Sequence, residues 1–327
     1  MPQPTRPNAA LGTTQDVPSK PRQNLDETTA YGATDQTAVP PPFGAPATTG
    51  EVGVLGPYRL VREMGRGSMG AVYEAVDTRL ERPVALKVML PQFAGDADGK
   101  ARFLREARAA ARVSHDNIVT VYEADERDGV AYIAMQYLTG CTLDRYLKKQ
   151  GEPNLAQTLR IGRETAAGLA AAHRLGLVHR DIKPGNLWLE APNGRVKILD
   201  FGLARPVEVQ AQLTQSGMIL GTPAYMSPEQ ARGAHVDARS DLFSLGAVLY
   251  RLMTGRTAFQ GTNTMALLVS LAVDEPPAIT TLNPSVPEPI AQFVHHLLAK
   301  KPEDRPGSAE EAAKRLRQLA ELAVKKN

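Results

Sequence analysis

The pattern of hydrophobic and polar positions divides the chain into a strand-rich part followed by a helix-rich part. Apolar and polar residues alternate through Tyr58–Leu90, in YRLVREMG, AVYEAVD and PVALKVML, which predicts three antiparallel strands. Similar patterns at Asn117–Tyr122 and Val130–Tyr137 predict two more strands. Ala101–Val113, between the first three strands and these two, has helical spacing. We therefore expect a sheet with one helix before residue 138.

Helical patterns dominate after residue 141. Leu155–Leu175 carries apolar residues at helical spacing, and Asp241 opens the stretch SDLFSLGAVLYRLMTG, which is apolar on nearly every side. A helix of that kind is typical of the centre of a large helical lobe. Between the two helices, an Asn-Gly turn separates Leu187–Glu190 from Val196–Leu199, which predicts a β-hairpin.

The first 53 residues differ in composition from the rest. They are rich in Pro and Thr, include a run of three prolines, and show neither helical nor strand periodicity. We predict a disordered tail over residues 1–53 and a folded domain over 54–327. The doublets Thr13-Thr14 and Thr28-Thr29 are candidate phosphorylation sites or docking sites for a phospho-reader domain, with a plain solvated linker as the alternative.

Bulk composition excludes several classes of protein. The chain has 327 residues, of which 43% are hydrophobic and 22% charged, so it can bury a sizeable core. A net charge of +3 gives no reason to expect a nucleic-acid partner. Without an apolar run of membrane-spanning length we expect no membrane insertion. The single cysteine, Cys141, allows no internal disulfide, and we expect a cytoplasmic location.

One loop, VHRDIKPGN, concentrates polar chemistry. It places Asp181, Lys183 and Asn186 within six residues, and its Pro-Gly pair excludes a helix. The predicted hairpin that follows returns Asp200, in ILDFGLAR, to a position beside Asn186. A carboxylate and an amide oxygen make a hard, oxygen-only site, which suits Mg²⁺ held together with substrate phosphates.

HRDIKPGN followed by DFG resembles the catalytic core of the eukaryotic-type (Hanks-type) serine/threonine protein kinases. A polar turn with a chance match is the alternative, and the further motifs in the same order disfavour it. GRGSMG, with Gly65, Gly67 and Gly70, also occurs in dinucleotide-binding folds, but a helix follows it there and a strand pattern follows it here. It resembles the kinase loop that covers the phosphates of ATP. The resemblance spans about residues 58–322 and is strongest to bacterial members.

The resemblance implies an α+β, two-lobed protein kinase fold, with a small β-rich lobe at about residues 58–137 and a larger α-helical lobe at about 141–325. ATP and Mg²⁺ would bind between the lobes, with Asn186 and Asp200 as the metal ligands. Lys87 in VALK and Glu106 match the ion pair that positions the phosphates. The residues implied for the adenine pocket are Val72, Ala85, Gln136 and Leu138 through their backbone, and Trp188. For Trp188, a plain core position is the alternative.

GTPAYMSPE resembles the end of a kinase activation segment. Within it, Thr222 matches the serine/threonine-specific form of the motif, as does Lys183 in the catalytic loop. By the same resemblance, Glu229 would pair with Arg305 as a structural contact. Downstream, Ser308 and Glu311 form a predicted capping box on the last helix.

Three arginines match the family's pocket for a phosphorylated activation segment, namely Arg102, Arg180 and Arg205. Thr214 and Ser216 stand where bacterial relatives carry their activating hydroxyls. A phosphate there would form charge-assisted hydrogen bonds with the arginines and order the segment. A solvated basic patch with incidental hydroxyls is the alternative.

The sequence therefore predicts a kinase that transfers the γ-phosphoryl group of ATP to Ser/Thr hydroxyls of proteins, with Asp181 accepting the hydroxyl proton and Lys183 neutralising the phosphoryl group. A pseudokinase scaffold is the main alternative, although every catalytic group is present. A small-molecule kinase would lack GTPAYMSPE. The expected partners are protein substrates, a transient second copy for autophosphorylation, and a phospho-reader on the tail.

Overall fold

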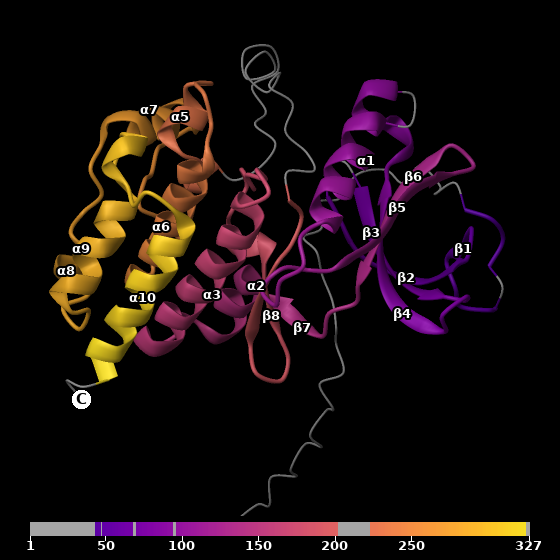
Figure 1. Ribbon diagram of the computed structural model, residues 1–327, viewed down its shortest axis with the longest axis horizontal. Helices are drawn as coiled ribbons and strands as arrows, with labels where there is room; N and C mark the ends of the chain where they lie inside the picture. The colour runs from indigo at the N-terminus through magenta and orange to yellow at the C-terminus, as the bar shows by residue number, and fades with distance from the viewer. Residues whose placement is uncertain (1–42, 47, 68–69, 94–95, 202–222, 325–327) are drawn as a thin grey trace, which may run out of the picture.

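The computed structural model describes residues 43–46, 48–67, 70–93, 96–201 and 223–324, arranged as two lobes (Figure 1). The small lobe contains a six-stranded sheet with the order β1-β2-β3-β4-β6-β5 and every neighbouring pair antiparallel. The large lobe is mostly helical. The predicted α+β, two-lobed fold class is confirmed.

The strands of the small lobe follow the alternating pattern of the sequence. They are β1 (Gly53–Leu55), β2 (Tyr58–Arg66), β3 (Gly70–Asp77), β4 (Arg82–Met89), β5 (Val121–Arg127) and β6 (Val130–Gln136). One strand begins later than predicted: the segment from residue 117 to 119 bonds to the large lobe, so β5 starts at Val121. Helix α1 (Ala97–Ala111) packs against β5 and β6 and starts earlier than predicted, because the Asp96 carboxylate caps it at the Gly99 N–H, 2.9 Å away.

Residues from the predicted tail contact the outer face of this sheet. Gly44 forms an isolated antiparallel bridge with Val54 of β1, and the ring of Phe43 packs edge-on against Tyr73, with centroids 5.2 Å apart. Gly53 makes this contact possible, because a Cβ at that position would lie 2.7 Å from Phe43 Cβ. The boundary expected near residue 53 thus falls inside structure that begins by residue 43.

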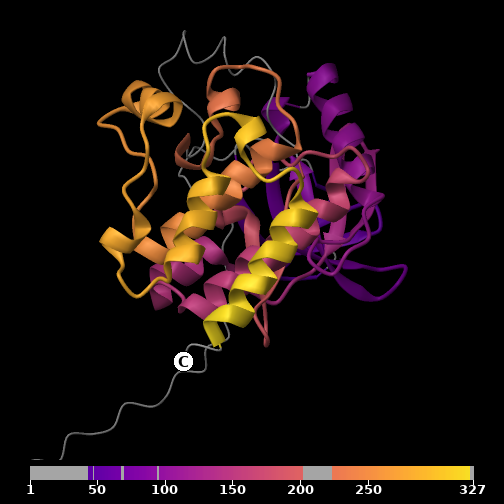
Figure 2. The same ribbon diagram turned by 60° about the vertical axis from the view of Figure 1, so that its left-hand side comes forward.

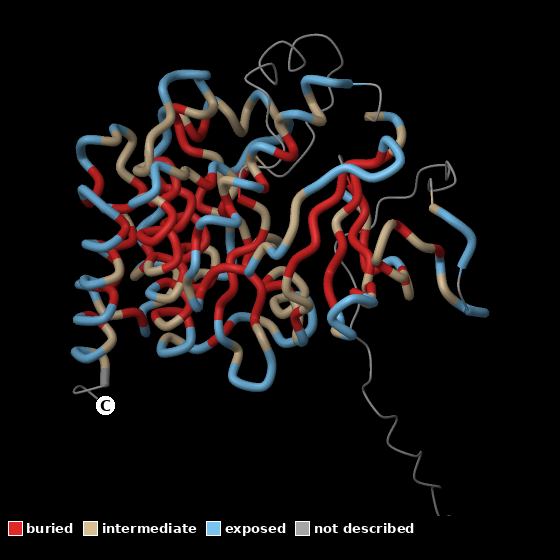
Figure 3. Tube along the Cα trace, turned by 45° about the vertical axis from the view of Figure 1, so that its right-hand side comes forward, coloured by how far each residue is buried: buried red, intermediate tan, exposed pale blue. Residues whose placement is uncertain are grey.

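The large lobe is built around one buried helix, α6. The helices in the described part of the lobe are α2 (Leu143–Gln150), α3 (Leu155–His173), α5 (Pro228–Ala231), α6 (Ala238–Thr254), α7 (Thr264–Val273), α8 (Ile279–Leu282), α9 (Glu288–Leu297) and α10 (Ala309–Val324). Figure 2 shows α10 running alongside α3. Buried residues follow the inner faces of these helices and the strands of the small lobe (Figure 3). None of the described helices is long and apolar enough to cross a bilayer.

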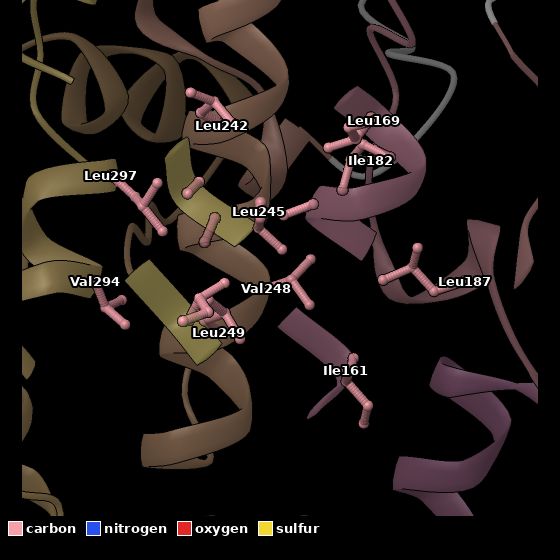
Figure 4. Close-up of a cluster of buried hydrophobic side chains, with 14 of the residues drawn as sticks. Ile161, Leu169, Ile182, Leu187, Leu242, Leu245, Val248, Leu249, Val294 and Leu297 are labelled. Atoms are coloured by element: carbon pink, nitrogen blue, oxygen red, sulfur yellow. The ribbon is translucent and has the colours of Figure 1, made fainter. Parts of the chain in front are cut away.

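The core of the large lobe lies where α3, α6 and α9 meet. Leu245, Val248 and Leu249 of α6 are fully buried and belong to one cluster with Ile161 and Leu297 (Figure 4). Burial of each such side chain stabilises the fold by roughly 1.5 to 3 kcal/mol relative to leaving it exposed. The helix predicted to be buried at the centre of the lobe is therefore confirmed, and it forms a rigid base beneath the catalytic loop.

A small sheet joins the lobes. It contains β7 (Gly140–Thr142), β8 (Leu187–Glu190) and β9 (Arg195–Ile198) in that order, and β8 and β9 form the predicted hairpin. A parallel bridge between Ile118 and Ile198 connects this hairpin to the chain between α1 and β5. The flanking backbone bonds are Val119 N to Ile198 O, 3.0 Å, and Ile198 N to Asn117 O, 2.8 Å.

The last helix departs from its predicted cap in one detail. The Glu311 N–H donates to the Ser308 hydroxyl over 3.1 Å, as expected for a capping box. The Glu311 carboxylate, however, accepts from the N–H of Gly307, at 2.9 Å, one residue before the predicted partner. The two side chains thus still bond to backbone N–H groups at the start of the helix, but the carboxylate reaches one residue further back.

Candidate active site

The catalytic-loop motif places its polar groups in direct contact. Lys183 Nζ lies 2.8 Å from Asp181 Oδ2, and Asn186 Nδ2 donates both to Asp181 O, at 2.7 Å, and to Asp181 Oδ2, at 2.9 Å. A single 3-10 turn, Pro184–Asn186, closes this arrangement. The three residues that the sequence predicted to converge are therefore brought together, with Asp181 as the shared acceptor.

Asp241 holds this loop from below. Its buried carboxylate accepts from the backbone N–H groups of His179 and Arg180, both over 2.8 Å, and contacts His173 Nε2 at 2.7 Å. Arg180 has φ of +65°, a left-handed conformation that is costly for this residue type and needs such support. Sequence reasoning placed Asp241 in the core and missed this role. A carboxylate that opens an otherwise apolar helix was the available signal.

A second set of bonds sets Asp200 beside the loop. Leu199 N donates to Asn186 O over 2.9 Å, and the imidazole Nε2 of His179 contacts Leu199 O at 2.8 Å. The ring of His179 also packs edge-on against Phe201, with centroids 4.8 Å apart. His179 is thus fully buried as a packing and hydrogen-bonding residue, as predicted. The hairpin brings Asp200 next to Asn186, the juxtaposition on which the predicted metal site depends.

The ion pair expected between Lys87 and Glu106 is not formed in this structure. Lys87 Nζ instead lies 2.8 Å from Asp200 Oδ1. Asp200 has φ of +52°, and its backbone conformation presents the carboxylate to the lysine on β4. Lys87 therefore bridges the small lobe to the metal-ligand candidate, and Glu106 is left outside the contact.

Glu106 sits in an unusual electrostatic position. Its Oε2 atom is buried and has no hydrogen-bond partner among the residues that the structure describes. Burial raises the pKa of this carboxyl above its ordinary value, while the positive charges of Arg105, Arg102 and Arg180 act in the opposite direction. Two of these, Arg102 and Arg180, belong to the predicted phosphate pocket, so that pocket borders Glu106 in this conformation.

The residues predicted for the adenine pocket meet in one apolar cluster. Val72, Ala85, Leu138 and Trp188 are all at most 6% exposed and pack in this cluster together with Met135. The Trp188 indole N–H donates to Thr139 O over 2.9 Å, which fixes the ring. Both readings of Trp188, a base platform and a core residue, are compatible with this placement.

Gln136 lies on the other side of the segment that links the lobes. Its Oε1 accepts from the buried Lys197 ammonium over 3.3 Å, and its Nε2 lies 3.4 Å from Glu190 Oε1. The side chain thus points to the β8–β9 hairpin. Because the backbone N–H of Gln136 donates to Thr120 O over 2.8 Å, the predicted contact with adenine would fall to its carbonyl group.

The glycine-rich motif forms the end of β2 and the start of β3. Gly67 N donates to Gly70 O over 2.8 Å. At Gly70 a Cβ would lie 2.8 Å from Val88 O, so the close approach of β3 to β4 requires glycine there. Gly65 pairs with Val72 where the register shifts. The residues between Gly67 and Gly70 lie outside the described part of the chain.

Several predicted residues belong to the segment that follows Phe201. Arg205, Thr214, Ser216 and Thr222 lie outside the described residues, as does the segment around them. The predictions about the phosphorylation sites and their third arginine therefore remain predictions.

The predicted pair between Glu229 and Arg305 is confirmed. Its two contacts are 2.7 and 2.8 Å long, and both side chains are buried. Burial opposes ionisation of Glu229, but hydrogen bonds from Arg305 and Ser240 outweigh it and lower the pKa of the carboxyl. This pair anchors α5, directly after the segment predicted to carry the activating hydroxyls.

Comparison with known proteins gives consistent matches. The profile of the protein kinase domain matches residues 58–316. The serine/threonine-protein kinase PrkC of Bacillus subtilis is 36% identical over 258 residues, which cover 79% of this chain and 40% of that protein. The serine/threonine-protein kinase PknL of Mycobacterium tuberculosis is 39% identical over 248 residues, which cover 76% of this chain and 62% of PknL. The chain thus spans less than two thirds of the length of either relative.

Among solved structures, the PknI kinase domain of M. tuberculosis superposes with a TM-score of 0.66 at 30% sequence identity. The match covers 82% of this chain and 97% of that domain. The similarity therefore extends over both lobes.

Proposed function

Because this chain belongs to the protein kinase domain family, we propose that it is an ATP-dependent serine/threonine protein kinase. One observation carries the proposal: Asp181, Lys183 and Asn186 are in mutual contact on one loop, and Asp200 lies beside them on the next. A proton acceptor, a cation and two oxygen ligands are the groups that phosphoryl transfer needs.

In this proposal Asp181 accepts the proton of the substrate hydroxyl as that oxygen attacks the γ-phosphorus. Lys183, 2.8 Å from Asp181, neutralises charge on the transferring phosphoryl group. Little covalent chemistry is required of the protein, so the rate comes from positioning these groups. Support for Ser and Thr as acceptors comes from the resemblance of the motifs around Lys183 and Thr222 to the serine/threonine-specific form.

The donor set at the loop fits Mg²⁺. Asn186 donates through its Nδ2 atom, so its amide oxygen remains available as a ligand, and the Lys87 pair uses only Oδ1 of Asp200. In the part of the chain that the structure covers, no group of three or more His, Cys, Asp or Glu residues could hold a metal. An ion here would take its remaining ligands from water and phosphate. When bound, it would neutralise the β- and γ-phosphate oxygens.

The same residues fit ATP. The apolar cluster of Val72, Ala85, Met135 and Trp188 offers surface for the base, next to backbone groups of Gln136 and Leu138. Lys87 would bind the α- and β-phosphates, and the backbone of Gly65, Gly67 and Gly70 would approach the triphosphate.

The contact between Lys87 and Asp200 supports an inactive resting conformation. For catalysis, Glu106 would replace Asp200 as the partner of Lys87, which frees Asp200 for the metal. We propose that phosphate on Thr214 or Ser216, bound by Arg102, Arg180 and Arg205, drives this exchange. The phosphate would neutralise the charges of Arg102 and Arg180, which attract the Glu106 carboxylate in this conformation. Glu106 would then be free to pair with Lys87.

We further propose protein substrates, transient pairing of two copies for autophosphorylation, and a phospho-reader that docks on a phosphorylated tail. The domain arrangement proposed is a tail before residue 43 and a kinase domain after it. A cytoplasmic location is supported by the dependence on ATP and by the lone Cys141, which can form no internal disulfide.

Transfer of labelled phosphate from ATP to a generic basic protein tests the proposal. The wild-type chain should label Ser and Thr, and Asp181→Asn should lose at least about 100-fold in rate. Asp304→Asn, a substitution of an exposed carboxylate in the large lobe, is the matched control and should stay fully active. Nucleotide binding by folded wild-type protein without any transfer would indicate a pseudokinase instead. Labelling confined to tyrosine would refute the acceptor class.

A further inference from the structure

Helix α1 presents a stripe of arginines to solvent. Arg105, Arg108 and Arg112 are exposed and lie at i, i+3 and i+7, so they share one face of the helix and of its C-terminal cap. The buried face of α1 is formed by other positions, with Phe103 and Ala107 among them. We call Arg105, Arg108 and Arg112 the arginine stripe.

Among the described residues, no acidic side chain forms an ion pair with the stripe, although the charge of Arg105 acts on the neighbouring Glu106. Across the described residues, no ion pair or hydrogen bond involves any of its three guanidinium groups, whereas nearby Lys100 is paired with Glu126 at 2.9 Å. Like charges three and four residues apart destabilise a helix. The dipole of α1 compensates for cations only in its last turn, so it accounts for Arg108 and Arg112 but not for Arg105 in mid-helix. Such an arrangement fits an anionic ligand.

The chain itself contains a matching anionic segment. Residues 24–36, NLDETTAYGATDQ, carry Asp26, Glu27 and Asp35 and no Lys, Arg or His. Phosphate on the neighbouring Thr28 and Thr29 would add up to four negative charges. This is the most acidic stretch of the first 42 residues, all of which lie before the Phe43 contact.

The segment is tethered to the lobe that carries the stripe. Phe43 and Gly44 are attached to the small lobe, the lobe that also carries α1. Asp35 lies eight residues and Asp26 seventeen residues before Phe43, which allows the chain to extend about 26 to 60 Å from that point. A tether of this length gives a high effective concentration, so even weak charge pairing suffices for binding.

We propose that residues 24–36 dock on the arginine stripe of α1 through Asp26, Glu27 and Asp35, and that phosphorylation of Thr28 and Thr29 strengthens the contact. The occupant is this chain's own tail. Docking places an anionic ligand on the helix that carries Glu106, and thereby links the state of the tail to the position of that helix. The unmodified contact does not depend on the proposed kinase activity.

Limited digestion of the full chain with trypsin tests the docking. In residues 1–42, Arg22 is the one basic residue that proline does not follow, and it lies two residues before the start of the proposed segment. The Asp181→Asn background keeps the tail unmodified. At 20 mM salt, release of residues 1–22 should be at least threefold faster when Arg105→Gln, Arg108→Gln and Arg112→Gln are combined. In 1 M salt, where charges are screened beyond about 3 Å, the difference should vanish.

A second triple variant controls for net charge. Lys314→Gln, Arg315→Gln and Arg317→Gln remove the same three charges from exposed positions of α10 and should leave the cleavage rate at the wild-type value. Equal rates for all three proteins at low salt would overturn the proposal. So would a change of the same size in the α10 variant, because it would reflect net charge alone.

Fluorescence anisotropy measures the effect of phosphate separately. A labelled peptide of residues 24–36 with phosphate on both threonines should bind the full chain at least tenfold more tightly than its unmodified form. The stripe variant should lose that gain and the α10 variant should keep it. Peptide binding to the stripe combined with an unchanged cleavage rate at Arg22 would mean that the surface receives acidic segments of other proteins, and would refute the tail as occupant.

Discussion

Lys87 Nζ contacts Asp200 Oδ1 at 2.8 Å, so the residue predicted to bind phosphate is paired with the residue predicted to bind metal. Each neutralises the other in the absence of substrate. Because Lys87 comes from β4 and Asp200 follows β9, the contact also ties the two lobes together. ATP and its metal would have to separate this pair, and the free energy lost with the Lys87–Asp200 contact would weaken their binding.

Substitution of Lys87 by Met should abolish phosphoryl transfer while largely preserving the fold. Asp200 is partly exposed and can be hydrated once the lysine is gone, so the loss in unfolding free energy should be about 1 kcal/mol or less. That corresponds to a fall in melting temperature of at most about 2 to 4 °C. Transfer should fall at least about 100-fold. Full activity in Lys87→Met would refute the phosphate-binding role.

Glu106→Gln should separate stability from activity. Burial raises the pKa of Glu106 in the folded protein above its value in the unfolded chain. Between these two pKa values the folded state binds more protons at this site, so the free energy of unfolding falls as pH rises. A neutral amide removes this penalty, and the variant should be at least as stable as wild type at pH 8. Its transfer rate should nevertheless drop. Melting temperature and activity are measured on the same samples. Glu321→Gln, at an exposed position of α10, is the control and should change neither. A clear loss of stability would mean that Glu106 is paired in solution.

Asp241→Asn should damage the catalytic loop from a distance. An amide cannot accept through both of its terminal atoms as the carboxylate does, so the N–H of either His179 or Arg180 loses its partner, at about 1 to 3 kcal/mol if it is the buried N–H of His179. The catalytic constant should fall more than the affinity for ATP. Asp237→Asn, at the N-cap of the same helix, is the matched control, because Asn caps a helix as well as Asp. Comparable losses in both variants would argue against a specific role for Asp241.

Lys300 should make stability depend on alkaline pH. Burial lowers the pKa of its ammonium to about 8, even though the group donates to Leu271 O and lies over the ring of Phe259. Between pH 8 and its ordinary value near 10.5 the unfolded chain holds the extra proton, so stability rises with pH in that window. Urea unfolding at pH 7.5 and 9.5 should show a smaller rise in Lys300→Met than in Lys301→Met. An identical rise in both would contradict the prediction.

Local patterns predicted most of the fold and the catalytic loop. Alternation located β2, β3 and β4, and the short Asn-Gly turn located the hairpin that carries Asp200, because these signals lie within a few residues of their effects. Contacts between distant segments were harder. The support of the loop by Asp241 spans about sixty residues, and nothing near residue 180 points to it. Phe43 was assigned to a tail because its partner, Tyr73, is thirty residues away.

The choice of partner for Lys87 could not be read from the sequence at all. Glu106 and Asp200 are both carboxylates, both are matched to the family, and both can reach the lysine in some arrangement of the lobes. Which one does so depends on the small free-energy difference between those arrangements. A motif identifies the groups available to a site, and the conformation decides which of them are in contact.

The bridge between Ile118 and Ile198 fixes the chain just after α1 to the large lobe. Asn117 and Val119, on the two sides of that bridge, are both hydrogen-bonded to Ile198 of the large lobe. Any rotation of α1 relative to the large lobe would therefore pivot near the C-terminal end of the helix. Glu106 stands seven residues before Val113, about 10 Å along the axis, so a swing of about 20° would displace it by about 4 Å. The free end near Asp96 would sweep twice as far. A displacement at the N-terminal end of the helix would therefore produce a smaller displacement at the Glu106 carboxylate.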